Sequence, residues 1–179
     1  PYFKNSNLID IRKQEIKPSY NKKDFNEFIG PAGKLFTNDI HEKKSTSLIK
    51  NKSGEFTLNK DFLLKMINND LKSLGVNYLA EYVAFGPGIT QNIEKRHSIY
   101  FLNKNNRRFG LNEVGYGLAQ LIPLLARKNY YTFFEKNYSA TTIIREPEAN
   151  IHPAHQSALA QNIIFNIIKK EKINNSFIV

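Results

Sequence analysis

The 179-residue chain contains no cysteine. Within this sequence, that absence excludes a disulfide framework, a zinc site with thiolate ligands and a thiol nucleophile. The chain also has no apolar run that approaches the ~20 residues of a membrane-spanning helix. Its first residues, PYFKNSNLIDIRKQ, lack the apolar segment of a secretory signal peptide. We therefore expect a cytoplasmic protein that has no membrane partner.

Acidic residues are few, since 16 Asp and Glu stand against 26 Lys and Arg and give a net charge of +10. Hydrophobic residues make up 41% and charged residues 23% of the chain, close to the averages of globular proteins. The length suits one ordinary domain with its own core. A basic surplus often marks a nucleic-acid partner. Here the basic residues are spread along the chain, so composition leaves that partner open.

Residues 1–58 are polar and irregular in pattern, and we treat them as a region apart from residues 59–179. The run Ile29-Gly30-Pro31-Ala32-Gly33 has the residues of a sharp turn. Charged residues fill the stretch 41–53, which is typical of a loop. We therefore expect a polar, irregular region with a Gly-Pro turn before residue 59.

The region that follows begins with a clear helical period. Asn59 can cap a helix that ends just before Gly75. Apolar residues recur at helical spacing along it: Leu63, Ile67, Leu71 and Leu74. Two extended segments and the tip of a hairpin are predicted next, over 76–85, 97–103 and 104–108.

The last third of the chain alternates helix and strand patterns. A Gly-Tyr-Gly motif opens one predicted helix, and Pro153 opens another. The β-branched run Thr141-Thr142-Ile143-Ile144 predicts a buried parallel strand, and residues 176–179 resemble the start of a further strand. This alternation predicts an α/β fold with a mixed or parallel sheet, flanking helices and a β-hairpin. The expected helices cover 115–134 and 153–171, and the expected strand covers 141–148.

Two carboxylates follow the predicted parallel strand. Glu146 and Glu148 would lie at its carboxyl end, where α/β proteins bind ligands, and could hold a metal ion or activate water. The plainer interpretation is a surface loop in which Arg145 neutralises the acids. The residues alone leave both interpretations open.

Two further motifs suggest binding. Gly115-Tyr116-Gly117 before an apolar helix would let backbone N–H groups face an anion, although a packed turn explains the same residues. Gln120 stands where a dinucleotide-binding motif needs its third glycine, and no G-x-x-x-x-G-K-[ST] phosphate loop occurs. His152 and His155 could share a metal ion, but a helix-capping or solvated role explains them as well.

Taken together, two segments resemble the ABC-type ATPase heads of SMC proteins, RecF and the OLD family, especially prokaryotic OLD-like defence ATPases. The first segment reads Glu113-Val114-Gly115-Tyr116-Gly117-Leu118-Ala119-Gln120-Leu121-Ile122-Pro123 and is similar to their signature motif. The second reads Ile143-Ile144-Arg145-Glu146-Pro147-Glu148-Ala149-Asn150-Ile151-His152-Pro153 and is similar to their Walker B strand and the D-loop after it. The resemblance covers about residues 28–179 and implies part of a P-loop NTPase fold.

The resemblance also implies a mechanism. Two such heads sandwich ATP, and the signature helix of one head contacts the γ-phosphate held by the other. Glu146 would be the catalytic residue, and Glu146 with Glu148 would bind Mg²⁺. In such phosphoryl transfer, most of the catalysis comes from positioning the reacting groups and from electrostatic stabilisation of the transition state. The residues implied to contact the nucleotide are Gly115, Tyr116, Gly117, Gln120 and His152.

The sequence departs from this family at three places. Arg145 occupies the position of the Walker B acid, no Walker A loop is present, and residues 177–179 stop where the family continues to its switch histidine. We therefore expect a head fragment that does not hydrolyse ATP alone. The resemblance further suggests a role in antiphage defence or DNA maintenance, with DNA and an effector nuclease as partners. A non-catalytic basic DNA-binding or scaffold module is the alternative.

Overall fold

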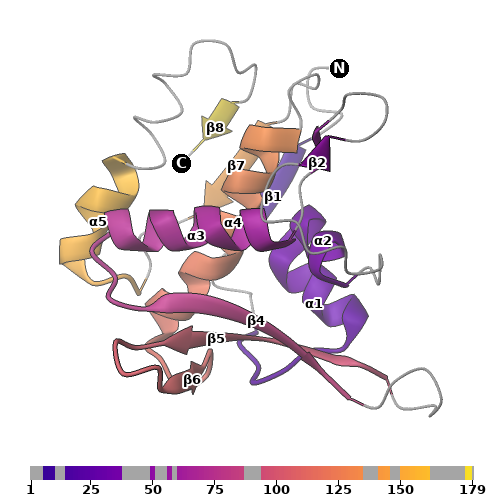
Figure 1. Cartoon of the computed structure of the whole chain (residues 1–179). Helices are drawn as coiled ribbons and strands as arrows, with labels where there is room; N and C mark the ends of the chain where they lie inside the picture. The colour runs from indigo at the N-terminus through magenta and orange to yellow at the C-terminus, as the bar shows by residue number, and fades with distance from the viewer. Residues whose placement is uncertain are drawn as a thin grey trace.

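We analysed a computed structural model of the chain, which has a mixed α/β fold (Figure 1). The strands are β1 (Ser6–Asp10), β2 (Ile49–Lys50), β3 (Phe56–Thr57), β4 (Leu79–Phe85), β5 (Arg96–Leu102), β6 (Arg108–Gly110), β7 (Thr141–Arg145) and β8 (Ser176–Ile178). The helices are α1 (Lys22–Ile29), η2 (Gly30–Ala32), α2 (Gly33–Thr37), α3 (Lys60–Ser73), α4 (Tyr116–Phe134) and α5 (Pro153–Ala160). The structure describes residues 6–10, 15–37, 49–50, 56–57, 60–86, 94–134, 141–145, 150–161 and 176–178.

Residues 22–37 form helices, so the expectation of an irregular region is wrong for this segment. Asn21 caps α1, because its side-chain oxygen accepts from the Asp24 N–H at 2.7 Å. Phe25, Phe28 and Ile29 have the spacing of one helix face and are buried. Composition missed these short helices because their other positions are polar. The predicted sharp turn is confirmed, since Gly30 ends α1 with φ +78°.

Helix α3 confirms the helix predicted to begin near Asn59. Leu63, Ile67 and Leu71 form its fully buried face. Gly75 follows the helix with φ +77°, a conformation that glycine adopts without strain. The Val76 N–H then donates to the Leu71 carbonyl at 2.9 Å, which closes the helix end.

The sheet β4-β5-β6 is antiparallel throughout, and it corrects the expectation of one mixed or parallel sheet. Its strands follow one another in sequence, and the short connection between β5 and β6 permits only a hairpin. At the tip of that hairpin, Asn103 Oδ1 accepts from the N–H groups of Asn105 and Arg107 at 2.9 and 3.0 Å. The predicted hairpin is therefore confirmed.

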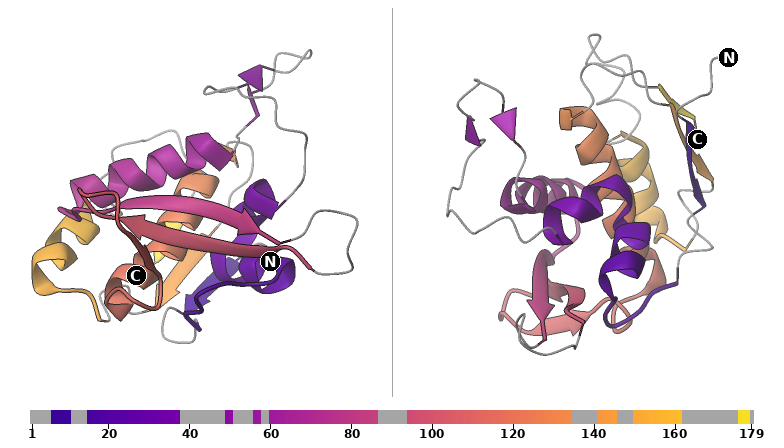
Figure 2. Two further views of the ribbon diagram at one scale, coloured as in Figure 1. Left: turned by 60° about the horizontal axis from the view of Figure 1, so that its bottom comes forward. Right: turned by 90° about the vertical axis from the view of Figure 1, so that its right-hand side faces the viewer.

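Parallel pairing is confined to a separate small sheet. There β7 lies between β1 and β8, and both neighbours run parallel to it (Figure 2). Ile143 pairs with Leu8 and Ile178, so the prediction of a parallel strand from the β-branched run is confirmed. Residues 146–148, the rest of the predicted strand, lie outside the described part of the chain, as do residues 162–171 of the last predicted helix.

Helix α4 runs through the middle of the molecule and packs against α1 and α3 (Figures 1 and 2). Ala119, Ile122 and Leu125 on this helix are fully buried. They share one core with aromatic residues of α1 and α2, so residues before and after position 58 pack together. Among the described residues, no helix is both long enough and apolar enough to cross a membrane.

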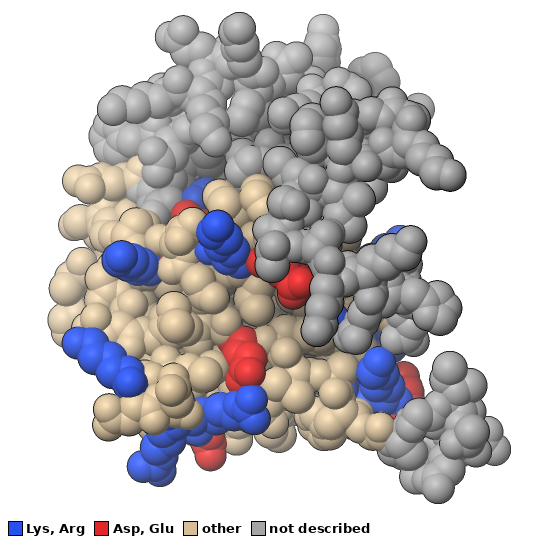
Figure 3. All heavy atoms as spheres, in the orientation of Figure 1, with Lys and Arg blue, Asp and Glu red and all other residues tan. Residues whose placement is uncertain are grey.

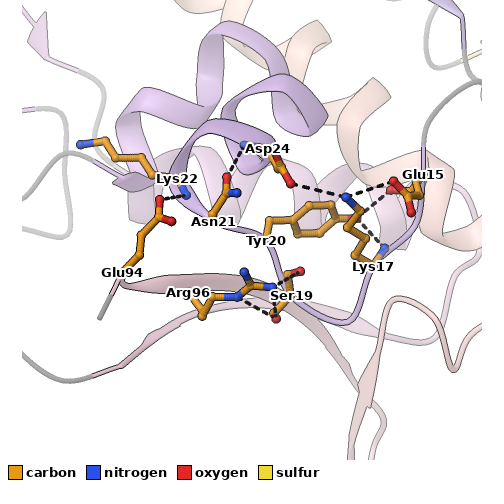
Figure 4. A network of polar contacts seen from close by, with 9 residues as sticks. All are labelled: Glu15, Lys17, Ser19, Tyr20, Asn21, Lys22, Asp24, Glu94 and Arg96. Atoms are coloured by element: carbon orange, nitrogen blue, oxygen red, sulfur yellow. Dashed lines mark hydrogen bonds and ion pairs between the residues drawn. The ribbon is translucent and has the colours of Figure 1, made fainter. Parts of the chain in front are cut away.

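The segment before α1 is tied to β5 (Figure 4). The N–H groups of Tyr20 and His97 each donate to the other residue's carbonyl at 2.8 Å. Arg96 donates from its guanidinium to the Ser19 carbonyl at 3.2 Å. The Lys22 N–H donates to a Glu94 carboxylate oxygen at 3.4 Å. These contacts hold the start of α1 against the antiparallel sheet.

Tyr20 is buried at the centre of this network. Its hydroxyl accepts from the Lys17 N–H at 3.0 Å and donates to the Glu15 carbonyl at 3.2 Å. Burial disfavours the charged phenolate and raises the pKa of Tyr20 to about 12. The ring also stacks on Phe28, with 4.8 Å between centroids, and so joins the segment to the core.

A candidate binding site at the start of helix α4

A cavity of about 400 Å³ lies at the first turn of α4. Three separate segments form its wall: the residues after α3, the Gly-Tyr-Gly motif, and the residues that lead into α5. Much of the wall is apolar, which is usual for small ligand sites. The lining residues are Gly75, Val76, Asn77, Tyr78, Gly115, Tyr116, Gly117, Leu118, Leu121, Asn150, Ile151, His152 and His155.

Gly117 packs directly on the segment that follows β7. A Cβ atom at position 117 would lie 2.0 Å from the Asn150 carbonyl oxygen and 3.0 Å from the Ile151 α-carbon. Such distances leave no room for a side chain. Asn150 itself has φ +63°, a left-handed conformation that asparagine tolerates better than most residues. The motif resembling a signature and the segment resembling a D-loop are thus in contact.

Gly115 has a different role from Gly117. Its carbonyl accepts from the N–H groups of Leu118 and Ala119 at 2.9 and 3.2 Å, so the first turn of α4 begins there. A Cβ atom at Gly115 would meet nothing within 4 Å. Tyr116 is 43% exposed beside it. The first-turn N–H groups and the helix dipole make this end of α4 electropositive.

Gln120, also predicted to contact a nucleotide, lies one turn further along α4 and is 1% exposed. It is not among the residues of the cavity wall. Helix α4 turns one face to the core, and Gln120 lies on that face together with apolar residues. Its contact with a nucleotide stays a prediction.

The two histidines are already engaged by the backbone. His152 caps α5, since its Nδ1 accepts from the Ala154 N–H at 3.2 Å. His155 Nδ1 lies 2.7 Å from the Leu74 carbonyl. A carbonyl only accepts, so His155 carries its proton on Nδ1. The capping interpretation of His152 is therefore confirmed, and among the described residues no group of three His, Asp or Glu could hold a metal ion.

The predicted catalytic and metal-binding acids, Glu146 and Glu148, lie outside the described residues. Their immediate neighbour is placed: Arg145 is the last residue of β7, and its backbone pairs with Asp10 of β1. In the sequence, the two acids stand between Arg145 and Asn150, the latter a residue of the cavity wall. Their roles stay predictions.

Helix α4 is held in place by a buried ion pair to α3. Lys128 Nζ lies 2.8 Å from Asp70 Oδ1, and Asn129 Nδ2 donates to Asp70 Oδ2 at 2.7 Å. The charged side chains are about nine-tenths buried. Because α3 ends at the cavity and α4 begins there, this network determines how the two walls face each other.

Arg127 explains the Gly-Pro turn, which the sequence could not assign to a contact. Its guanidinium donates to the carbonyls of Glu27, Phe28 and Ile29 at 2.9 to 3.3 Å, at the end of α1. A Cβ atom at Gly30 would lie 2.4 Å from Arg127 Nε. Burial lowers the pKa of Arg127. Glycine is favoured at this position because of its φ of +78°, and the Arg127 side chain lies against it.

Comparing the chain with protein-family models, with curated proteins and with solved structures gives no match. Inference about function therefore rests on the residues and their geometry.

Proposed function

We propose that this chain forms part of an ABC-type ATPase head that binds ATP between two copies. The observation that carries the proposal is the packing of Gly117 against Asn150 and Ile151. These residues belong to the two motifs that resemble the head domains, and Asn150 stands 33 positions after Gly117 in the sequence. Their meeting at one cavity is what a shared nucleotide site requires.

The start of α4 supplies what a phosphate needs. Gly115 leaves open space above the first turn, because nothing lies within 4 Å of its missing Cβ atom. A phosphate oxygen can approach the backbone N–H groups closely there. In the proposed dimer, the γ-phosphate held by the second head occupies this space, and Tyr116 and His152 border it.

The parallel sheet supports the same assignment. Open α/β sheets bind ligands outside the carboxyl ends of their strands, and β7 is the central strand here. Glu146 and Glu148 follow that end directly. In the proposed site they bind Mg²⁺ and orient the attacking water, while Arg145 replaces the acid of related heads. Carboxylate oxygens are the usual protein ligands of Mg²⁺.

The proposal is tested by nucleotide-dependent association of the intact protein. Sedimentation velocity should show a shift from monomer to dimer with ATP and Mg²⁺, and a smaller shift or none with ADP, because only ATP has the γ-phosphate that joins two heads. Gly115→Ala should weaken this association, because its methyl group would occupy the space proposed for the γ-phosphate. An unchanged sedimentation coefficient with ATP would overturn the proposed sandwich.

A further inference from the structure

The two histidines of the cavity wall lie next to each other at the start of α5. The centroids of the His152 and His155 rings are 5.9 Å apart, and the ring planes are tilted by 60°. In each ring the Nδ1 atom is engaged by the backbone. The Nε2 atoms make no hydrogen bond with any residue that the structure describes. Both Nε2 atoms are therefore available to a ligand in the cavity.

The backbone contacts determine which Nε2 atom carries a proton. The Nδ1 atom of His152 accepts from the Ala154 N–H, so the proton of this ring lies on Nε2. The Nδ1 atom of His155 donates to the Leu74 carbonyl, so the Nε2 atom of the neutral ring holds a lone pair. His152 thus offers a hydrogen-bond donor, and His155 offers an acceptor.

The surroundings of the histidine pair are uncharged. Among the described residues that line the cavity, none is Asp, Glu, Lys or Arg. Residues 150–161, which lead into α5 and form it, have no charged side chain either. The left edge of the molecule in Figure 3, at the level of α5 in Figure 1, is correspondingly uncharged. An ionised phosphate oxygen has lone pairs only, which the lone pair of His155 Nε2 repels. The pair suits a neutral group that both donates and accepts.

A hydroxyl group meets this requirement. It donates one hydrogen bond and accepts up to two, so it can accept from His152 and donate to His155. Two hydrogen bonds of about 2.9 Å that meet at one oxygen span at most about 5.8 Å. That reach is comparable with the 5.9 Å between the ring centroids. The ribose of a nucleotide carries two adjacent hydroxyls, which lie nearer to the phosphates than any donor of the base.

We propose that His152 and His155 bind the ribose hydroxyls of the nucleotide, and that the site therefore prefers ribonucleotides to deoxyribonucleotides. The ribose assignment rests on the proposed function, because it takes the phosphate position from the start of α4. The start of α4 and both histidines border one cavity of about 400 Å³. That volume lies within the range of about 300–1,000 Å³ for sites that hold whole small ligands.

The test compares ATP with 2′-deoxy-ATP and 3′-deoxy-ATP in sedimentation velocity of the intact protein with Mg²⁺. The readout is the nucleotide concentration that gives half-maximal association. ATP should act at a concentration about 3- to 10-fold lower than at least one of the two deoxynucleotides. A change of that size corresponds to the loss of one hydrogen bond.

His152→Asn and His155→Asn remove the Nε2 atoms but keep a polar group near the position of Nδ1. An asparagine amide can still accept from the Ala154 N–H as a helix cap, or donate to the Leu74 carbonyl. Both variants should require more ATP and should lose most of the preference for ATP over the deoxynucleotides. The matched control, Ser157→Asn, lies at an exposed position of α5 outside the cavity wall and should keep that preference.

Equal action of all three nucleotides would overturn the ribose assignment and leave the proposed sandwich in place. A preference for ATP that both histidine variants retain would overturn it as well. Weaker action of inosine triphosphate that disappears in His155→Asn, with no preference among the sugars, would assign the histidines to the base instead. If no nucleotide promotes association, the proposed sandwich is wrong and the ribose assignment fails with it.

Discussion

The α-carbon of Gly117 faces the carbonyl of Asn150 so closely that a methyl group there would lie 2.0 Å from its oxygen. The contact joins the first turn of α4 to the segment after β7. Two backbones approach this closely only where a side chain is missing. The glycine thus determines the distance between the two walls of the cavity.

Gly117→Ala should therefore destabilise the protein. The new methyl group overlaps backbone atoms, and overpacking of this kind costs about 1–3 kcal/mol even though alanine favours the helix. Gly115→Ala is the matched control and should cost less than about 1 kcal/mol, because only its capping preference changes. Urea denaturation measures both free energies of unfolding. Equal losses would contradict the close packing at Gly117.

The ion pair between Asp70 and Lys128 predicts a different response. Asp70→Ala leaves a buried ammonium without its carboxylate and should cost about 3–5 kcal/mol of unfolding free energy. The double variant Asp70→Leu/Lys128→Met replaces both charges and should recover most of that loss. Thermal and urea denaturation measure the stability of both variants. If the double variant is as unstable as Asp70→Ala, the unpaired buried charge is not the cause of the stability loss.

Tyr20 predicts a loss of stability at high pH. Its pKa is about 12 in the folded chain and 10.0 in an exposed tyrosine, so the unfolded state loses its proton first. The contribution of Tyr20 is complete below pH 10 and disappears as the pH rises from 10 to 12. We expect a loss of about 2 kcal/mol over that window.

Tyr20→Phe separates this effect from the titration of lysines. The variant lacks the hydroxyl and its hydrogen bonds to Lys17 and Glu15, so it should be less stable at neutral pH. Its free energy of unfolding should fall less steeply than that of the unchanged protein above pH 10. Parallel curves for the two proteins would show that Tyr20 does not titrate differently on folding.

Glu146→Gln tests the proposed chemistry. If Glu146 orients the attacking water, its amide should slow ATP turnover of the intact protein by about 100-fold or more. ATP-dependent association should remain, since the phosphate contacts at α4 are unchanged. Glu27→Gln, at an exposed position of α1, is the control and should leave turnover unchanged. Equal turnover of Glu146→Gln and the control would remove Glu146 from this role.

Local patterns predicted the elements well where they were strong. The period of Leu63, Ile67 and Leu71 located α3, and the β-branched run at 141–144 located a parallel strand. The short helices α1 and α2 escaped prediction, because their stability comes from burial of Phe25, Phe28 and Phe36 in a shared core. Helices of that length depend on tertiary packing more than on propensity.

The sequence by itself therefore determined which segments are helical or extended, and that Gly115 and Gly117 begin a helix, because spacing and capping act between near neighbours. Only the tertiary structure decided that Gly117 meets Asn150, that Arg127 lies against Gly30, and that His155 donates to the Leu74 carbonyl. Those contacts join residues far apart in the chain. They depend on how whole helices and strands pack together, which local sequence patterns do not predict.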